Sequence, residues 1–147
     1  MKTDTQKAKE LLEKNHYTCV LCQSGTVYTT VERGVKPLLD WHKGELDLQG
    51  FCAADKVVGK AAAFLYVLLG IKEVYAPVMS NGAIEILFRY GVHPEYDLSV
   101  KHIINRAGTG MCPMEQAVMD VSEPEQAWEA IIRKWRILQE AKKEETY

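Results

Sequence analysis

The spacing of apolar and polar positions along the chain predicts an ordered series of strands and helices. Two β-rich runs, residues 17–23 and 26–31, flank the turn residues Ser24 and Gly25 and predict a hairpin. The most apolar of the predicted helices, residues 50–70, is rich in Ala, Val and Leu, and we expect it to be buried on most sides. The other expected elements are helices over 4–14, 36–43, 80–90 and 112–119 and from Ser122 onward, and strands over 72–78 and 100–105.

The order of these elements predicts the fold class. A hairpin followed by helix–strand–helix–strand units is typical of a mixed sheet with helices on its faces. The strands over 72–78 and 100–105 should form a right-handed parallel crossover, with Pro77 at the end of its ladder, where a missing donor is tolerated. We therefore predict an α/β fold, a three-layer α/β/α sandwich, as a single domain over residues 1–147 with a frayed end at 139–147.

Composition narrows the class of protein. The formal net charge is −2 at pH 7 and no segment combines dense Lys and Arg with aromatic residues, so binding to long nucleic acid is not expected. The longest uninterrupted apolar run, residues 61–70, is too short to span a bilayer, and we expect no signal peptide and no membrane partner. The 4 cysteines lack a regular framework, which favours a reduced, cytoplasmic setting. Trp128 and Trp135 share one face of the last helix, which would seal the core or form a homo-oligomer interface.

The first candidate site lies at residues 55–60. Lys56 and Lys60 are four residues apart and would share one face of the predicted helix, with Gly59 leaving the backbone open between them. Asp55 would lie in the first turn, where the helix dipole favours a negative charge. In a pocket, Lys56 would contact an anion or a carbonyl group, and Asp55 would orient it or act as a base. The alternative is that Asp55 only caps the helix and both lysines are solvated.

The second candidate site is the run Asn105 to Glu115 (NRAGTGMCPME), between a predicted strand and a short helix. Loops at this position bind ligands in open α/β sheets, and glycines allow backbone amides to surround an anion. The sulfur of Cys112 would lie at a helix N-terminus, which favours the thiolate. The alternative is that Cys112 is a packed thiol and Glu115 a capping residue. The expected ligand contacts are Arg106, Gly108, Thr109 and Gly110 from this run, Lys60 from the first site, and Ser80 and Asn81 from the start of the helix predicted over 80–90.

Cysteine and histidine spacing argues against a metal site. Cys19 and Cys22 resemble half of a zinc site, but an offset of three within a strand sends two side chains to opposite faces. The sequence holds no second pair with matching spacing, and its 4 histidines are scattered. We therefore expect no metal and no cofactor.

Taken together, the segments GFCAADKVVGKAAA (residues 50–63) and NRAGTGMCPME (residues 105–115) resemble a small family of unknown function with a cytidine-deaminase-like fold. The resemblance spans residues 5–138 and implies the hairpin-first mixed sheet. Active deaminases carry His/Cys-x-Glu at the start of the helix after the hairpin and Pro-Cys-x-x-Cys at the start of the next helix. The resemblance places residues 54–56 (ADK) and 78–83 (VMSNGA) at these positions, so zinc-dependent deamination is not expected.

The sequence and the resemblance together predict a zinc-free deaminase-fold protein that binds a small-molecule ligand. The pocket would lie between the helix that begins near Asp55 and the loop Arg106–Glu115. The resemblance implies an anionic or nucleotide-like metabolite, an inference by fold analogy.

Two alternatives remain open at this point. The chain would be an enzyme if Cys112 or Lys56 provided covalent chemistry while Asp55 or Glu115 moved protons. It would be a redox or metal-handling accessory protein if Cys112 paired with Cys52.

Overall fold

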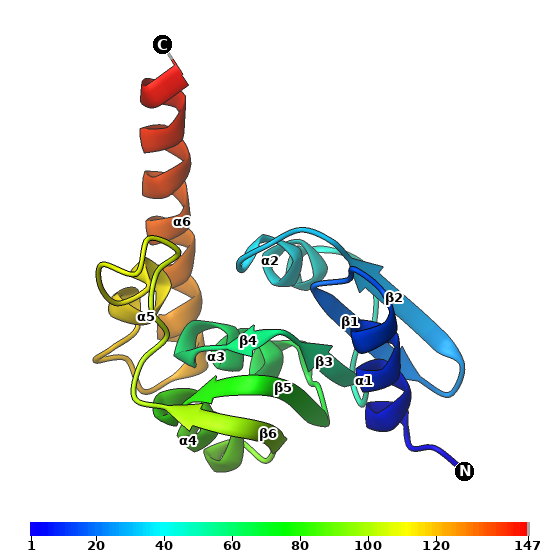
Figure 1. Cartoon of the computed structure of the whole chain (residues 1–147). Helices are drawn as coiled ribbons and strands as arrows, with labels where there is room; N and C mark the ends of the chain where they lie inside the picture. The colour runs from blue at the N-terminus through cyan, green and yellow to red at the C-terminus, as the bar shows by residue number, and fades with distance from the viewer. Residues whose placement is uncertain (147) are drawn as a thin grey trace.

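The structure, a computed structural model that describes residues 1–146, is built on one mixed β-sheet with helices on both faces (Figure 1). This arrangement confirms the predicted fold class, the three-layer α/β/α sandwich. The strands are β1 (Cys19–Gln23), β2 (Thr26–Thr30), β3 (Cys52–Asp55), β4 (Val57–Val58), β5 (Glu73–Ser80) and β6 (His93–Val100). The helices are α1 (Asp4–Lys14), α2 (Lys36–Lys43), α3 (Lys60–Leu69), α4 (Asn81–Arg89), α5 (Pro113–Ala117) and α6 (Pro124–Thr146).

The sheet contains one antiparallel half and one parallel half. The predicted hairpin is confirmed, because β1 pairs with β2 in antiparallel register, and β1 also pairs with β3 in the same way. From β3 onward the pairing is parallel, with β5 next to β3 and β6 next to β5. The predicted parallel crossover through α4 is therefore present. Its second strand is β6 at 93–100, so the strand predicted over 100–105 is wrong.

The predicted helix over residues 50–70 is wrong in its first half. Residues 52–55 and 57–58 are strands, and the helix α3 begins only at Lys60. A central strand of a sheet that is covered on both faces is apolar on both sides, so it lacks the alternation that identifies a strand. Asp55 consequently ends a strand, and Lys56 and Lys60 do not share a helix face.

Pro77 lies inside β5 and explains why β3 and β4 are separate strands. Ala54 pairs with Tyr75 and Val57 with Val78, so both strands keep one register along β5. The break at Lys56 therefore falls opposite Pro77, whose ring nitrogen has no hydrogen to donate to a ladder. The expectation that Pro77 would end the ladder is wrong, since β5 continues to Ser80.

Apolar side chains fill the sheet on both faces. On one face α1 packs Ala8 and Leu12 against Val20 and Tyr75. The opposite face carries the larger core, to which α2, α3, α4 and α6 contribute. The last helix projects beyond this core at its C-terminal end (Figure 1). Fraying of residues 139–147 remains a prediction that lies in part outside the described residues.

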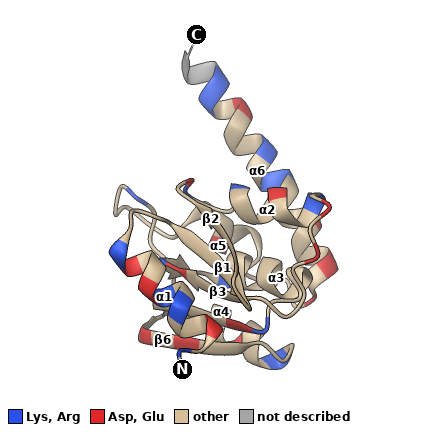
Figure 2. Ribbon diagram, turned by 90° about the vertical axis from the view of Figure 1, so that its right-hand side faces the viewer, with Lys and Arg blue, Asp and Glu red and all other residues tan. Residues whose placement is uncertain are grey.

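Both Lys/Arg and Asp/Glu occur along α1 and α6, so neither helix carries a single sign of charge (Figure 2). Within residues 1–146, no helix combines the length and the apolar content that a membrane crossing requires. The bounds of α1 and α2 match those predicted, although Thr3 and not Asp4 caps α1, and α6 begins at Pro124 and not at Ser122.

Candidate functional site

The buried carboxylate of Glu115 contacts two other predicted site residues, Lys60 and Ser80. Its side chain is 6% exposed. It accepts hydrogen bonds from the backbone N–H of Lys60, from Ser80 Oγ at 3.2 Å and from the backbone N–H of Ile103 at 3.2 Å. His102 lies at the margin, with Nδ1 4.0 Å from Glu115 Oε2. Three residues predicted for the site, Lys60, Ser80 and Glu115, therefore lie together in the structure. Their role in ligand binding stays a prediction.

Local sequence explains why these groups meet. Helix α3 begins after Gly59, which has no side chain to cap the helix, so the first amides need a partner from elsewhere. Glu115 provides it from α5, and its charge also suits the positive end of the α3 dipole. A Cβ atom on Gly59 would lie 2.6 Å from Glu115 Oε1, so the contact requires glycine there. Ser80 caps α4 in turn, with its Oγ 3.2 Å from the N–H of Ala83.

A cavity of about 250 Å³ lies beside this cluster, between α4 and the segment that joins α5 to α6. The Lys60 ammonium group borders it and donates a hydrogen bond to the carbonyl oxygen of Met119 at 2.9 Å. Arg89 and Glu85, 2.6 Å apart, form an ion pair within α4. The lining residues are Lys60, Gly82, Glu85, Ile86, Arg89, Met119, Asp120, Val121 and Ser122.

Asp55 belongs to a different group of buried polar atoms. Its Oδ2 accepts a hydrogen bond from the Tyr66 hydroxyl at 2.6 Å, and the same hydroxyl lies 3.1 Å from the sulfur of Cys19. Burial raises the pKa of the Asp55 carboxyl from 3.8 to about 6, while hydrogen bonds from Tyr66 and from two backbone amides oppose the shift. Burial likewise raises the pKa of Cys19 and Tyr66. Within residues 1–146, no hydrogen bond or ion pair joins Asp55 to the run 105–115.

The remaining predicted ligand contacts are exposed. Lys56 lies at the break between β3 and β4, and Asn81 is the first residue of α4. Arg106, Gly108, Thr109 and Gly110 lie on an exposed loop.

That loop satisfies its own hydrogen bonds through Asn105. The side chain of Asn105 accepts from the N–H of Thr109 at 3.0 Å, and its backbone carbonyl accepts from the N–H of Gly108 at 3.0 Å. The carbonyl of Gly110 accepts from the N–H of Asn105 at 2.8 Å. The amides of Gly108 and Thr109 are therefore engaged within the loop, and anion binding by this loop stays a prediction.

Cys112 is half-buried and packs against the larger core at the start of α5. Cys52 lies on β3 directly opposite Cys22, which packs under α1, so Cys52 faces α1. The two sulfurs are therefore on opposite faces of the sheet, and the Cys112–Cys52 pair considered from the sequence is wrong. The prediction that Cys19 and Cys22 point to opposite faces is confirmed, since they belong to the two separate core clusters.

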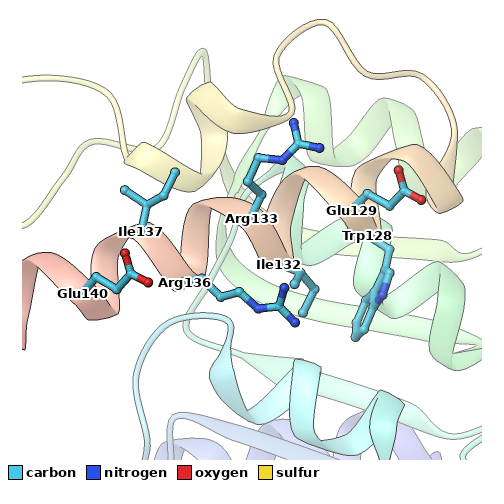
Figure 3. A pocket seen from close by; sticks show the side chains of 7 residues that line it. All are labelled: Trp128, Glu129, Ile132, Arg133, Arg136, Ile137 and Glu140. Carbon is cyan, nitrogen blue, oxygen red and sulfur yellow. The ribbon is translucent and has the colours of Figure 1, made fainter.

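A second cavity, of about 380 Å³, lies along α6 (Figure 3). None of the predicted site residues lines it. Trp128, Ile132 and Arg136 point toward α2, whereas Arg133 and Ile137 point toward α5. The Trp128 ring stacks on His42 of α2, with ring centres 4.3 Å apart. Two glutamates, Glu129 and Glu140, complete the lining.

The structure also corrects the positions at which deaminase motifs would occur. The helix after the hairpin is α2, which begins at Lys36, and the next helix is α3, which begins at Lys60. The residues at these starts, 35–37 (VKP) and 59–61 (GKA), contain neither His/Cys-x-Glu nor Pro-Cys-x-x-Cys. Within the part of the chain that the structure describes, no three His, Cys, Asp or Glu side chains are grouped so that they could hold a metal ion.

Sequence reasoning missed three contributors to these polar groups. Tyr66 gave a signal, because a buried tyrosine hydroxyl needs a hydrogen-bond partner and this tyrosine lies in an otherwise apolar helix. Ile103 contributes only a backbone N–H, and His102 stands alone in sequence, so neither gave a recognisable signal.

Comparison with known proteins agrees with this fold. The crystal structure of a DUF1893 family protein (TM1506) from Thermotoga maritima, at 2.70 Å resolution, is similar with a TM-score of 0.82 and 24% sequence identity, over 91% of this chain and 92% of that one. The dCMP deaminase from the cyanophage S-TIM5, in apo form, shows a TM-score of 0.41 and 14% identity over 53% of this chain and 77% of that one. Among curated proteins, none matches the chain. The model of the family TM1506, a domain of unknown function (DUF1893), matches residues 7–134, and the chain therefore belongs to the DUF1893 family.

Proposed function

We propose that this chain is a binding domain for a small anionic, nucleotide-like metabolite. The ligand would occupy the cavity between α4 and the α5–α6 segment, next to the Glu115 cluster. Lys60, which the sequence predicted as a ligand contact, lines this cavity. It replaces the pocket expected near Asp55, whose carboxylate is engaged with Tyr66.

The observation that carries the proposal is the state of the Lys60 ammonium group. It borders the cavity and donates to a neutral carbonyl, that of Met119. Among the side chains described, those of residues 1–143, no carboxylate forms an ion pair with it within 4.0 Å, whereas Arg89 in the same cavity is already paired with Glu85. A lysine ammonium group that borders a cavity and has no direct ion pair is available to contact an anionic ligand.

The surroundings of Lys60 support the same ligand class. Gly82 is the second residue of α4, and the N-terminus of a helix adds a partial positive charge of about half a unit. Asp120 also lines the cavity and would accept hydrogen bonds from a polar ring. At about 250 Å³ the cavity suits a small ligand, because pockets for drug-sized molecules occupy roughly 300–1,000 Å³.

Titration of the protein with inorganic phosphate and with a nucleoside monophosphate, followed by amide NMR shifts and calorimetry, tests this proposal. We expect saturable shifts at Gly82 and at 119–122, and a loss of at least tenfold in affinity for Lys60→Ala because one charge-assisted contact is removed. Lys60→Arg should restore most of the affinity.

Lys43→Ala, which removes an exposed lysine at the end of α2, is the matched control and should bind like the wild type. Equal affinities of the wild type and Lys60→Ala, or shifts confined to the loop 105–110, would contradict the proposed site.

The enzymatic alternative receives less support from the geometry. Within residues 1–146, no hydrogen bond or ion pair links the Cys112 thiol or the Lys56 ammonium to a base. Neither side chain lines the cavity beside Lys60.

A further inference from the structure

Two cysteines that are far apart in sequence lie directly opposite each other in the sheet. Cys22 on β1 and Cys52 at the start of β3 are register partners in the antiparallel pair. Side chains of directly opposite residues lie on the same face of a sheet. Here that face is the one under α1, since Cys22 packs in the same core cluster as Ala8 and Leu12 of α1. Both thiols are free.

The Cα spacing expected for this pair is compatible with a disulfide bond. Opposite residues of an antiparallel pair have Cα atoms about 4.5 or 5.5 Å apart, according to the type of pair. Both distances fall within the range of about 4.4–6.8 Å found in disulfides. The other two cysteines cannot compete, because Cys19 and Cys112 belong to the opposite face of the sheet.

We propose that Cys22 and Cys52 form a reversible disulfide, which makes the end of the β1–β3 ladder under α1 a site of redox modification. The oxidant is a low-molecular-weight disulfide. The sulfur of Cys52 attacks it, forms a mixed disulfide and releases one small thiol. The sulfur of Cys22 then attacks the sulfur of Cys52 and releases the second small thiol. The two cysteines lose two electrons, the small disulfide gains them, and the two cysteine protons end on the released thiols.

Position and burial decide the order and the speed of these steps. Cys52 is 7% exposed and Cys22 is 1% exposed, so Cys52 is the sulfur that meets the oxidant first. The pair lies at the end of the β1–β3 ladder, close to the exposed hairpin turn at Ser24 and Gly25. The first turn of α1 lies over the pair, with Asp4 Oδ1 4.0 Å from the sulfur of Cys22, and such terminal turns open readily. Burial raises the pKa of both thiols, which makes the reaction slow in the closed state.

Incubation of the full chain with oxidised glutathione, followed by intact mass and peptide mapping, tests the proposal. We expect the number of free thiols to fall from four to two, a mass loss of two hydrogens, and a mapped Cys22–Cys52 link that dithiothreitol removes. Cys112→Ser should form the same link. Cys22→Ser and Cys52→Ser should each stop at a mixed disulfide or remain reduced.

Four free thiols in the oxidised wild type, or a mapped link that joins any other pair, would overturn the proposal. Because the wild-type result decides the question, it does not depend on the folding of either serine variant. Ligand binding at the Lys60 cavity is measured separately, so the failure of one proposal leaves the other testable.

Discussion

At the scale of single residues, the environment of Asp55 sets the behaviour of its carboxyl group. The side chain ends β3 and faces Tyr66 of α3, which donates to it at 2.6 Å. Removal from water disfavours the charged form, and this effect outweighs the three hydrogen bonds that favour it, so the pKa rises to about 6. A group of this kind titrates near neutral pH without any catalytic partner, which fits a structural role.

Asp55→Asn should reduce the pH dependence of stability. The folded-state pKa of about 6 lies above the usual 3.8, so the folded protein holds this proton more tightly than the unfolded chain does. The contribution of Asp55 to the free energy of unfolding is therefore complete below about pH 4 and is lost as the pH rises through about 6. The shift corresponds to at most about 3 kcal/mol, and partial exposure of the residue reduces this to about 2 kcal/mol.

Urea denaturation of the wild type and Asp55→Asn between pH 4 and pH 7 measures the effect. The difference between the two proteins isolates this group from the other carboxylates. Parallel curves over this range would show that Asp55 does not titrate as its surroundings imply.

At the scale of elements, Glu115 holds the start of α3 against α5. Substitution of Glu115 by alanine should cost about 3 kcal/mol, because the partly buried amides of Lys60 and Ile103 lose their acceptor. Glu115→Gln keeps one carbonyl oxygen but loses the charge at the helix N-terminus, so about 1 kcal/mol is expected. Chemical denaturation provides the measurement, and the exposed Glu45→Gln serves as control. Equal stability of Glu115→Ala and the wild type would remove Glu115 from its capping role.

Gly59→Ala tests the same junction from the α3 side. A Cβ atom there would meet Glu115 Oε1 at 2.6 Å, so either the carboxylate or the start of α3 must shift. Overpacking of this kind costs about 1–3 kcal/mol. Gly110→Ala is the matched control, since nothing lies within 4 Å of its added Cβ, and a change below about 0.5 kcal/mol is expected. Thermal unfolding of both variants distinguishes the two sites, and equal melting temperatures would contradict the close contact.

Elements could be predicted wherever periodicity was unambiguous. The hairpin, α1, α2 and α4 each show a clear apolar stripe or turn signal, and they form where expected. The apolar run at 50–70 failed because a doubly covered strand and a buried helix have the same composition. The strand β6 was missed although residues 93–100 alternate, with Pro94, Tyr96 and Leu98 on one side and charged or polar residues on the other.

The candidate site was less predictable because it depends on distances between elements. Lys60, Ser80 and Glu115 were each named from local patterns, and the fold brings them together. Asp55 was predicted at the start of a helix. In the structure it ends the strand β3, and its carboxylate accepts a hydrogen bond from Tyr66. The Cys22–Cys52 pairing required the register of β1 against β3, which no single segment of sequence contains.

At the scale of the whole molecule, the projecting end of α6 should be dispensable for folding. The last residues of α6 that pack on the core are Trp135 and Leu138, whereas residues 140–143 are exposed and the helix continues beyond the body (Figure 1). Deletion of residues 140–147 should therefore change the free energy of unfolding by less than about 1 kcal/mol.

Deletion from Trp128 onward is the contrasting variant, because it removes the fully buried Ile131 and the Trp128–His42 stack that joins α6 to α2. Loss of this packing exceeds what a marginally stable fold tolerates, and we expect a chain without a cooperative unfolding transition. Circular dichroism during urea titration measures the unfolding of both deletion variants. A shorter chain that lost its transition after removal of 140–147 alone would show that the end of α6 stabilises the body, contrary to the packing seen here.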